Sequence, residues 1–245
     1  MNHRIDVLQD TDEGLPLPFD PVVERDSRPR AQRWDQRRIA GDEVLRLVHQ
    51  VFLPQTDRSP SVVALAGVDN DHGCGQICTL VAEVLARDPM RSVCLVETDF
   101  RSPDLLGPWA EDGYGLADAL VRKGPIRAFA RPAHTANNLW VLGCGTLVGD
   151  CYNVFASGAL RERVAELRTE FDFVIMHAAS LVRYADAIGL GQLADGLILV
   201  VEAGVTRRDD TTRVLATLRA SKIGVLAAVL NNGVSPIPEK LYKLL

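Results

Sequence analysis

The sequence predicts one α/β domain built on a doubly wound, mainly parallel sheet. The chain has 245 residues, a length that suits a single α/β domain with a short extension. Hydrophobic residues make up 47% and charged residues 24%, the balance of a globular protein. Short runs that are apolar throughout alternate with segments of helical periodicity, and this alternation is typical of parallel strands covered by helices on both faces.

The elements follow one another from residue 41 onward. A helix is expected from Asp42 to Phe52, because apolar residues recur there at three-and-four spacing and Pro54 ends the pattern. Strands and helices then alternate along the chain. The expected strands are Val62–Ala66, Val93–Val96, Leu139–Leu142, Phe173–Met176, Leu197–Val201 and Val225–Leu230, and the expected helices are Cys78–Arg87, Leu116–Arg122, Ala159–Glu170 and Asp210–Ala220.

Residues 1–38 differ in composition from the rest. They carry four prolines among many charges, and such a segment cannot bury enough apolar surface to offset its ordering entropy. We therefore expect a disordered N-terminal arm over 1–38 and a folded domain over 39–245. No apolar run approaches the roughly 18 residues of a membrane span, and Met1–Asp12 lacks an apolar signal core. We expect the chain in the cytoplasm, reaching a membrane only through a partner.

Charge and cysteine content exclude two further classes. The net charge of −5 and the scattered Lys and Arg residues argue against a nucleic-acid-binding surface. The five cysteines form no CxxC pair, which suits a reduced interior better than a disulfide scaffold. His72, Cys74 and Cys78 have no second ligand pair nearby, so we expect no metal site there.

The segment Ala66–Thr79 joins the first strand to a helix and allows three interpretations. Gly73 and Gly75 could simply form a turn. They could also belong to a dinucleotide fold, since Glu97 follows at the distance of a ribose-binding acid, although Cys78 replaces the third glycine of that fingerprint. The third interpretation is a P-loop, whose longer connection fits this segment better.

In a P-loop, the backbone at the start of the helix surrounds phosphate groups. Gln76 then stands where a lysine would contact the β and γ phosphates, and Ile77 stands where a hydroxyl would hold Mg²⁺. The predicted nucleotide-binding residues of this loop are Gly73, Cys74, Gly75, Gln76, Ile77 and Cys78.

Further segments extend the comparison. Val96-Glu-Thr-Asp-Phe-Arg-Ser-Pro103 has the form of an acidic motif at a strand end, the strand Phe171–Met176 ends at His177, and Asn231 follows the last strand. Together these segments resemble the cytoplasmic kinase domain of bacterial tyrosine kinases in capsule and exopolysaccharide assembly, which is related to the MinD and ParA ATPases. In this comparison His177 replaces the Walker B aspartate, and Glu97 replaces the first aspartate of the acidic motif.

The resemblance implies a P-loop NTPase-like three-layer sandwich, with ATP or ADP and Mg²⁺ as ligands and Asn231 as a purine contact. It also implies Asp99 and Glu97 as candidate catalytic carboxylates, the alternative being a solvated strand end with a salt bridge to Arg101. For His177 we expect a satisfied, partly buried side chain. Because Gln76, Ile77 and His177 remove the phosphate clamp and most of the magnesium shell, we expect weak or no binding of ATP.

The expected function is therefore that of a catalytically impaired relative, which regulates polysaccharide assembly by protein–protein interaction. The implied partner is a membrane chain-length regulator (a polysaccharide co-polymerase) or an active kinase paralogue. Glu43, Arg46 and His49 lie on one helical face and resemble the family's Glu-x-x-Arg-x-x-Arg oligomerisation motif, which predicts self-association or docking on a paralogue.

Two enzymatic alternatives remain. One is a slow tyrosine kinase or ATPase that uses Asp99 and an unconventional metal shell. The other is a MinD-like ATPase, which is disfavoured because Asp71 stands where that group carries its signature lysine. The family's C-terminal tyrosine cluster is missing, since the four tyrosines are dispersed and only Tyr242 lies near the end.

Overall fold

The computed structural model describes residues 43–53, 59–69, 73–103, 105, 114–146, 154–155 and 158–232. The predicted arm over 1–38 lies outside these residues, as do Asp71, His72 and Tyr242. The division of the chain into an arm and a domain therefore stays a prediction.

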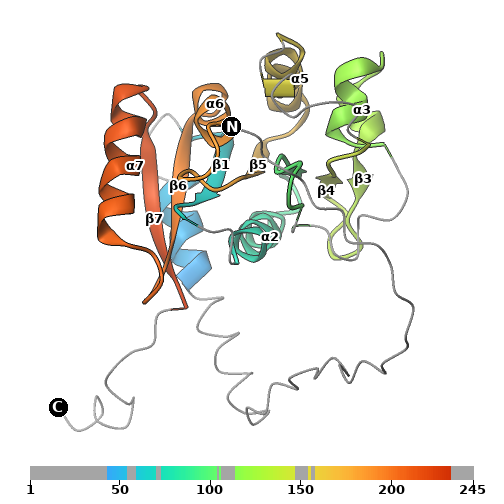
Figure 1. The fold of residues 1–245 in the computed structure, drawn as a ribbon. Helices are drawn as coiled ribbons and strands as arrows, with labels where there is room; N and C mark the ends of the chain where they lie inside the picture. The colour runs from blue at the N-terminus through green and yellow to red at the C-terminus, as the bar shows by residue number, and fades with distance from the viewer. Residues whose placement is uncertain are drawn as a thin grey trace, which may run out of the picture. The chain divides into compact units, whose positions relative to one another are not determined.

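Seven strands form one sheet in the order β3-β4-β2-β5-β1-β6-β7. All neighbours in it are parallel except β3 and β4, which pair antiparallel at one edge. Figure 1 shows this order across the sheet. The strands are β1 (Val62–Gly67), β2 (Val93–Glu97), β3 (Arg131–Pro132), β4 (Leu139–Leu142), β5 (Phe173–Ala178), β6 (Gly196–Glu202) and β7 (Val225–Asn231).

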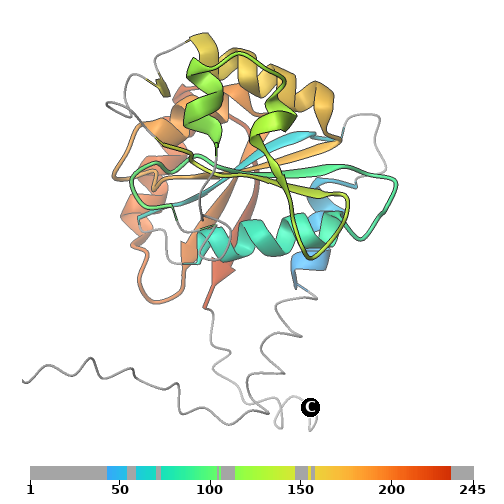
Figure 2. The ribbon, with the colours of Figure 1, turned by 90° about the vertical axis from the view of Figure 1, so that its right-hand side faces the viewer.

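Helices cover the sheet on both faces, as Figure 2 shows. A helical segment over 43–51 and α2 lie on one face, and α3, α5, α6 and α7 lie on the other. The described helices with defined ends are α2 (Cys74–Leu85), α3 (Leu116–Val121), α5 (Gly158–Glu170), α6 (Asp186–Leu193) and α7 (Arg208–Ala220), together with the 3₁₀ turn η1 (Ile126–Phe129).

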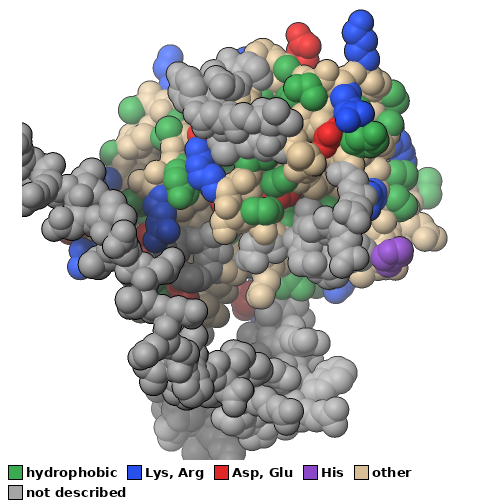
Figure 3. All heavy atoms as spheres, turned by 45° about the vertical axis from the view of Figure 1, so that its right-hand side comes forward, with side chains coloured by type: hydrophobic (Ala, Val, Ile, Leu, Met, Phe, Trp, Pro, Cys, Tyr) green, Lys and Arg blue, Asp and Glu red, His purple; other side chains and the backbone are tan. Residues whose placement is uncertain are grey.

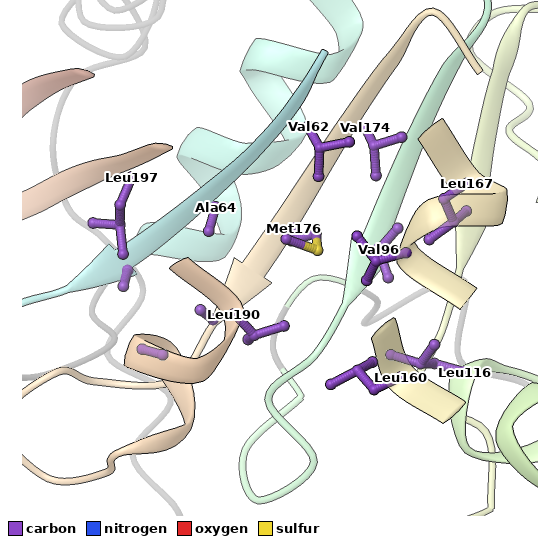
Figure 4. Packing of buried hydrophobic residues seen from close by; sticks show 14 of the residues in the cluster. Val62, Ala64, Val96, Leu116, Leu160, Leu167, Val174, Met176, Leu190 and Leu197 are labelled. Atoms are coloured by element: carbon purple, nitrogen blue, oxygen red, sulfur yellow. The ribbon is translucent and has the colours of Figure 1, made fainter. Parts of the chain in front are cut away.

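Strand periodicity divides the core into two layers. Along β1, Val62 and Ala64 point to the face covered by α5, α6 and α7, whereas Val63 and Leu65 point to the face covered by α2. Figure 4 shows the first of these layers, in which Met176 of β5 lies among side chains from neighbouring strands and helices. Strands buried on both faces explain why these runs contain almost no polar residues.

The predicted fold class is confirmed, and the expected strands and helices are all present with small shifts at their ends. The largest shift is at α2, which begins at Cys74 instead of Cys78, because Gly73 ends the preceding loop in a left-handed conformation. The sequence analysis missed α6, η1 and the two-residue strand β3. Gly189 and Gly191 lie within α6, and glycine lowers helix propensity enough to hide so short a helix.

None of the helices in the described stretches combines the length and apolar character that a membrane span requires. Figure 3 shows Lys and Arg side chains spread over the visible face among acidic and apolar ones. They do not gather there into the basic stripe that nucleic-acid-binding domains present.

Candidate functional site

The predicted site residues come from strands whose C-terminal ends share one edge of the sheet. β1, β2, β5, β6 and β7 are all parallel, so the loops that follow them emerge on the same side. In open α/β sheets this edge is where ligands bind.

Gly73 connects the loop after β1 to the start of α2. Its φ of 77° lies in the left-handed region, and a Cβ at this position would lie 2.5 Å from Nδ2 of Asn231. Glycine is required on both counts, since other residues adopt this conformation rarely and any side chain would meet the Asn231 amide. The start of α2 and the end of β7 are therefore in contact, and the structure brings two predicted nucleotide-binding residues together.

The first turn of α2 has lost the charge that a phosphate site uses. Cys74, Gly75 and Cys78 are buried, and Gln76 is exposed. Ile77 is 6% exposed and packs in the core on the α2 face of the sheet. The turn thus offers an anion one neutral side-chain amide in addition to its helix dipole and backbone N–H groups.

Glu97 and His177 form a buried pair across neighbouring strands. They occupy paired positions at the ends of β2 and β5, and both side chains are 0% exposed. Nδ1 of His177 lies 2.8 Å from Oε1 and 3.1 Å from Oε2 of Glu97. The contact is favourable when Nδ1 carries a proton and donates it to the ionised carboxylate. His177 is thus more deeply buried than the sequence predicted, and its partner is Glu97.

The two candidate catalytic carboxylates hold the loop that follows β2. Oε1 of Glu97 accepts a hydrogen bond from the backbone N–H of Asp99 at 2.8 Å, and Oε2 accepts one from Leu105 at 3.1 Å. Asp99 is 2% exposed, and its Oδ1 accepts from the backbone N–H groups of Arg101 and Ser102 at 3.0 and 3.2 Å. The Glu97 oxygens therefore satisfy buried backbone donors, and the Asp99 oxygen satisfies partly buried ones.

The side chain of Arg101 reaches toward α6. Its guanidinium pairs with Asp186 and lies 4.4 Å from the ring centre of Tyr184. The expectation of a solvated strand end with a salt bridge to Arg101 is wrong, because Glu97 and Asp99 are buried, and Arg101 contacts Asp99 through its backbone N–H. The segment after β2 is consequently held by Glu97 at Asp99 and Leu105, and by Asp186 at Arg101 between them.

A second polar cluster at the ends of β1 and β6 was missed by the sequence analysis. Thr206 Oγ1 donates to Oδ1 of Asp69 at 2.7 Å and accepts from the N–H of Glu202 at 3.0 Å. Asn232 donates to Oε1 of Glu202 at 3.1 Å. Oε2 of Glu202 is the single buried side-chain nitrogen or oxygen without a hydrogen-bond partner in the described part of the chain. A signal was available, since Glu202 ends an apolar strand run just as Glu97 does.

The donor set at this edge of the sheet does not fit Mg²⁺, which requires near-octahedral oxygen ligands. Ile77 places an apolar side chain at the predicted hydroxyl position, and His177 presents a nitrogen already directed at Glu97. The Thr79 hydroxyl donates to the carbonyl of Gly75 at 3.0 Å, within its own helix. Across the described ranges, no three or more His, Cys, Asp or Glu side chains are grouped to hold a metal ion.

The predicted interface residues lie together on the helical segment 43–51. Glu43, Arg46 and His49 are all exposed, and Arg46 pairs with Glu43 at 3.1 Å. The opposite face of the segment packs on the sheet through Val44 and Val48, among other apolar residues. This geometry leaves the three side chains accessible, and their role in association stays a prediction.

Comparison with known proteins identifies relatives of one kind, although no protein-family model matches the chain. The chain is 26% identical to the tyrosine-protein kinase YwqD of Bacillus subtilis, over 71% of this chain and 73% of YwqD. It is 26% identical to the tyrosine-protein kinase Wzc of Salmonella typhimurium over 70% of this chain, and 28% identical to the succinoglycan biosynthesis transport protein ExoP of Rhizobium meliloti over 59%. It spans only 24% of Wzc and 19% of ExoP.

Solved structures show the same fold at lower identity. The kinase domain of VpsO superposes with a TM-score of 0.73 at 19% identity, covering 84% of this chain and 100% of that domain. The kinase domain of the Escherichia coli tyrosine kinase ETK gives 0.68 at 14% identity, covering 81% and 79%. A ParA-family ATPase from Chlorobium tepidum gives 0.57 at 14% identity, covering 71% and 74%. The fold is that of P-loop kinase and MinD/ParA-type domains.

Proposed function

We propose that this chain, a relative of the tyrosine kinases of bacterial polysaccharide assembly, is catalytically impaired and regulates exopolysaccharide or capsule assembly by protein–protein interaction. The proposal rests on the sequence similarity to YwqD, Wzc and ExoP and on the changed residues of the predicted nucleotide site. The relatives connect the chain with tyrosine kinases and polysaccharide transport. The altered site argues against phosphoryl transfer.

The observation that carries the proposal is the Glu97–His177 pair. Phosphoryl transfer depends almost entirely on positioning and on electrostatic stabilisation by metal ions and cationic side chains. At this edge of the sheet a buried imidazole takes one acidic position, and both oxygens of Glu97 are engaged by His177 and by backbone N–H groups. Gln76 and Ile77 remove the remaining charge and hydroxyl. Losing one such stabilising group typically lowers turnover by about a hundredfold to a thousandfold.

The proposed partner is a membrane polysaccharide co-polymerase or an active kinase paralogue, and it would bring the chain from the cytoplasm to the inner face of the membrane. Exposed Glu43, Arg46 and His49 support a contact through the helical segment 43–51. The same segment could also join copies of this chain into a homo-oligomer.

A slow kinase or ATPase is the second candidate. The contact between Gly73 and Asn231 favours it, because the start of α2 still presents backbone N–H groups beside the predicted purine-contacting amide. Backbone contacts for a nucleotide would therefore survive in part even where side-chain phosphate and metal contacts are lost.

A complementation assay in the native host distinguishes the interaction module from the slow enzyme. The gene is deleted and complemented with site variants, Gln76→Ala and Asp99→Asn, or with the face variant Glu43→Ala/Arg46→Ala. If the chain acts as an interaction module, both site variants restore polymer export and the face variant does not. Asp99→Asn retains an oxygen for the N–H groups of Arg101 and Ser102, so it leaves the loop intact.

Loss of polymer export in both site variants, with export retained in the face variant, would favour the enzyme. Melting temperatures of the purified variants serve as the control for folding. The face variant should melt with the wild type, because both substituted side chains are exposed.

A further inference from the structure

The ends of β2 and β5 carry one acid and one base, both fully buried. Glu97 and His177 are paired residues of adjacent strands with 0% side-chain exposure. The resemblance to bacterial tyrosine kinase domains implies a carboxylate at each of these two positions in those domains. Two carboxylates so close together repel each other when both are ionised, and a bound cation is what offsets that repulsion.

An imidazole at position 177 removes the need for a cation. Its Nδ1 lies within 3.1 Å of both oxygens of Glu97, near enough to donate a hydrogen bond to the carboxylate. A buried carboxylate without such a partner is strongly destabilising. The imidazole of His177 therefore supplies the hydrogen bond that the buried carboxylate of Glu97 needs, without a bound cation.

Glu97, held in place by His177, in turn restrains the loop after β2. Its two oxygens accept from the N–H groups of Asp99 and Leu105, which lie two and eight residues after Glu97. Asp99 in turn accepts from the N–H groups of Arg101 and Ser102. One carboxylate, held in place by one imidazole, thus fixes the backbone at Asp99 and at Leu105.

We propose that His177 takes the place of a divalent cation: it holds Glu97, and through Glu97 the described residues that follow β2 (98–103 and 105), in one conformation that needs neither metal nor nucleotide. In switch-type P-loop proteins such loops are ordered by Mg²⁺ and the γ-phosphate. Here the loop is held in one state, so any partner that contacts it binds irrespective of nucleotide. His177 is a positioning residue in this account. The inference deepens the proposed function and rests on it for the absence of Mg·ATP.

The decisive variants are His177→Asp and the isosteric control His177→Asn, measured by thermal unfolding in EDTA and in millimolar MgCl₂. The wild type should melt at the same temperature in both. His177→Asp places a second carboxylate beside Glu97, so its melting temperature in EDTA should fall by about 10 °C, and Mg²⁺ should restore most of the loss. His177→Asn lacks the second carboxylate and should not respond to Mg²⁺.

A second measurement uses the unmodified chain and so does not depend on the variants folding. Hydrogen exchange at the amides of Asp99 and Leu105 should be equally slow in EDTA, in MgCl₂ and with Mg·ATP added. A rise in wild-type protection or melting temperature with Mg²⁺ alone overturns the inference, as does an equal Mg²⁺ response of His177→Asp and His177→Asn. Firm binding of Mg·ATP by the wild type overturns the proposed function instead, so the two failures are distinguishable.

Discussion

Asp195 joins the start of β1 to the start of β6, and its carboxylate accepts hydrogen bonds from Ser61, Val62 and Arg168. Its Oδ2 accepts from the N–H groups of Ser61 and Val62 at 2.8 and 2.9 Å, and Arg168 of α5 donates to both of its oxygens at 2.6 and 2.8 Å. Asp195→Ala removes all of these acceptors at once. The N–H groups of Ser61 and Val62 then lose this acceptor, and the Arg168 guanidinium loses its carboxylate partner while keeping the Ser61 hydroxyl and the Leu193 carbonyl.

The expected loss follows from these contacts. Hydrogen bonds to a charged group contribute about 1.5 to 3 kcal/mol when shielded from water, but the side chains of Asp195 and Arg168 are 31% and 35% exposed. Solvent screening reduces the contribution of such a pair. We expect Asp195→Ala to lower the free energy of unfolding by about 2 kcal/mol, which corresponds to roughly 4 to 8 °C in melting temperature for a chain of this size.

The pH dependence provides an independent check. Partial burial by itself raises the pKa of Asp195, but the hydrogen bonds from Val62, Arg168 and Ser61 outweigh it and hold the pKa below its usual value. A lowered pKa means that the carboxylate stabilises the fold above the unfolded-state pKa of about 3.9 and that this contribution disappears as the pH falls through the folded-state value.

Urea unfolding of wild type and Asp195→Ala should therefore show a constant difference near neutral pH that shrinks below about pH 4. Glu162→Ala is the matched control, because Glu162 is an exposed acid on the same helix as Arg168. An unchanged midpoint in Asp195→Ala, or a difference that grows on acidification, would refute this reasoning.

Three further predictions concern the site, the helical face and the arm. Gly73→Ala should lower the free energy of unfolding by about 1 to 2 kcal/mol, because the φ of Gly73 is 77° and a Cβ there would meet Asn231. The control Gly158→Ala should not lower it, because a Cβ at Gly158 has nothing within 4 Å. Thermal unfolding of the two variants measures the difference. Glu43→Ala/Arg46→Ala should shift the sedimentation profile to smaller species if this face drives self-association, and an identical profile would exclude that. Deleting residues 1–38 should barely move the melting temperature, and a drop of many degrees would show that the arm docks on the domain.

The sheet was predictable because its signal lies within each strand. Runs such as Val62–Ala66 and Leu197–Val201 are apolar at every position, and such short β-branched-rich runs favour a strand covered on both faces. Helix ends were less accurate, since the start of α2 depends on the left-handed conformation of Gly73, which the sequence allows but does not impose. β3 has two residues, both exposed, and carries no periodic signal.

The site was predictable as a set of positions but not as a set of contacts. The sequence placed Glu97 and His177 at strand ends, yet their pairing depends on β2 and β5 being neighbours, and strand order is a tertiary property. The cluster around Glu202 was missed for the same reason, since Asp69, Thr206 and Asn232 reach it from three different loops. The contacts of Glu97 and Glu202 therefore depend on residues that are distant in the sequence.

Titration calorimetry with ATP and ADP measures whether this site still binds Mg·ATP. A helix N-terminus contributes about 0.3 to 1 kcal/mol, or about 2 when partly buried, whereas a Kd of about 1 mM already requires about 4 kcal/mol. The wild type should therefore give no measurable binding heat. The triple reversion Gln76→Lys, Ile77→Thr and His177→Asp should gain Mg-dependent binding, and the same variant with Asn at position 177 should gain less. Micromolar affinity with measurable turnover in the unmodified protein would contradict the account.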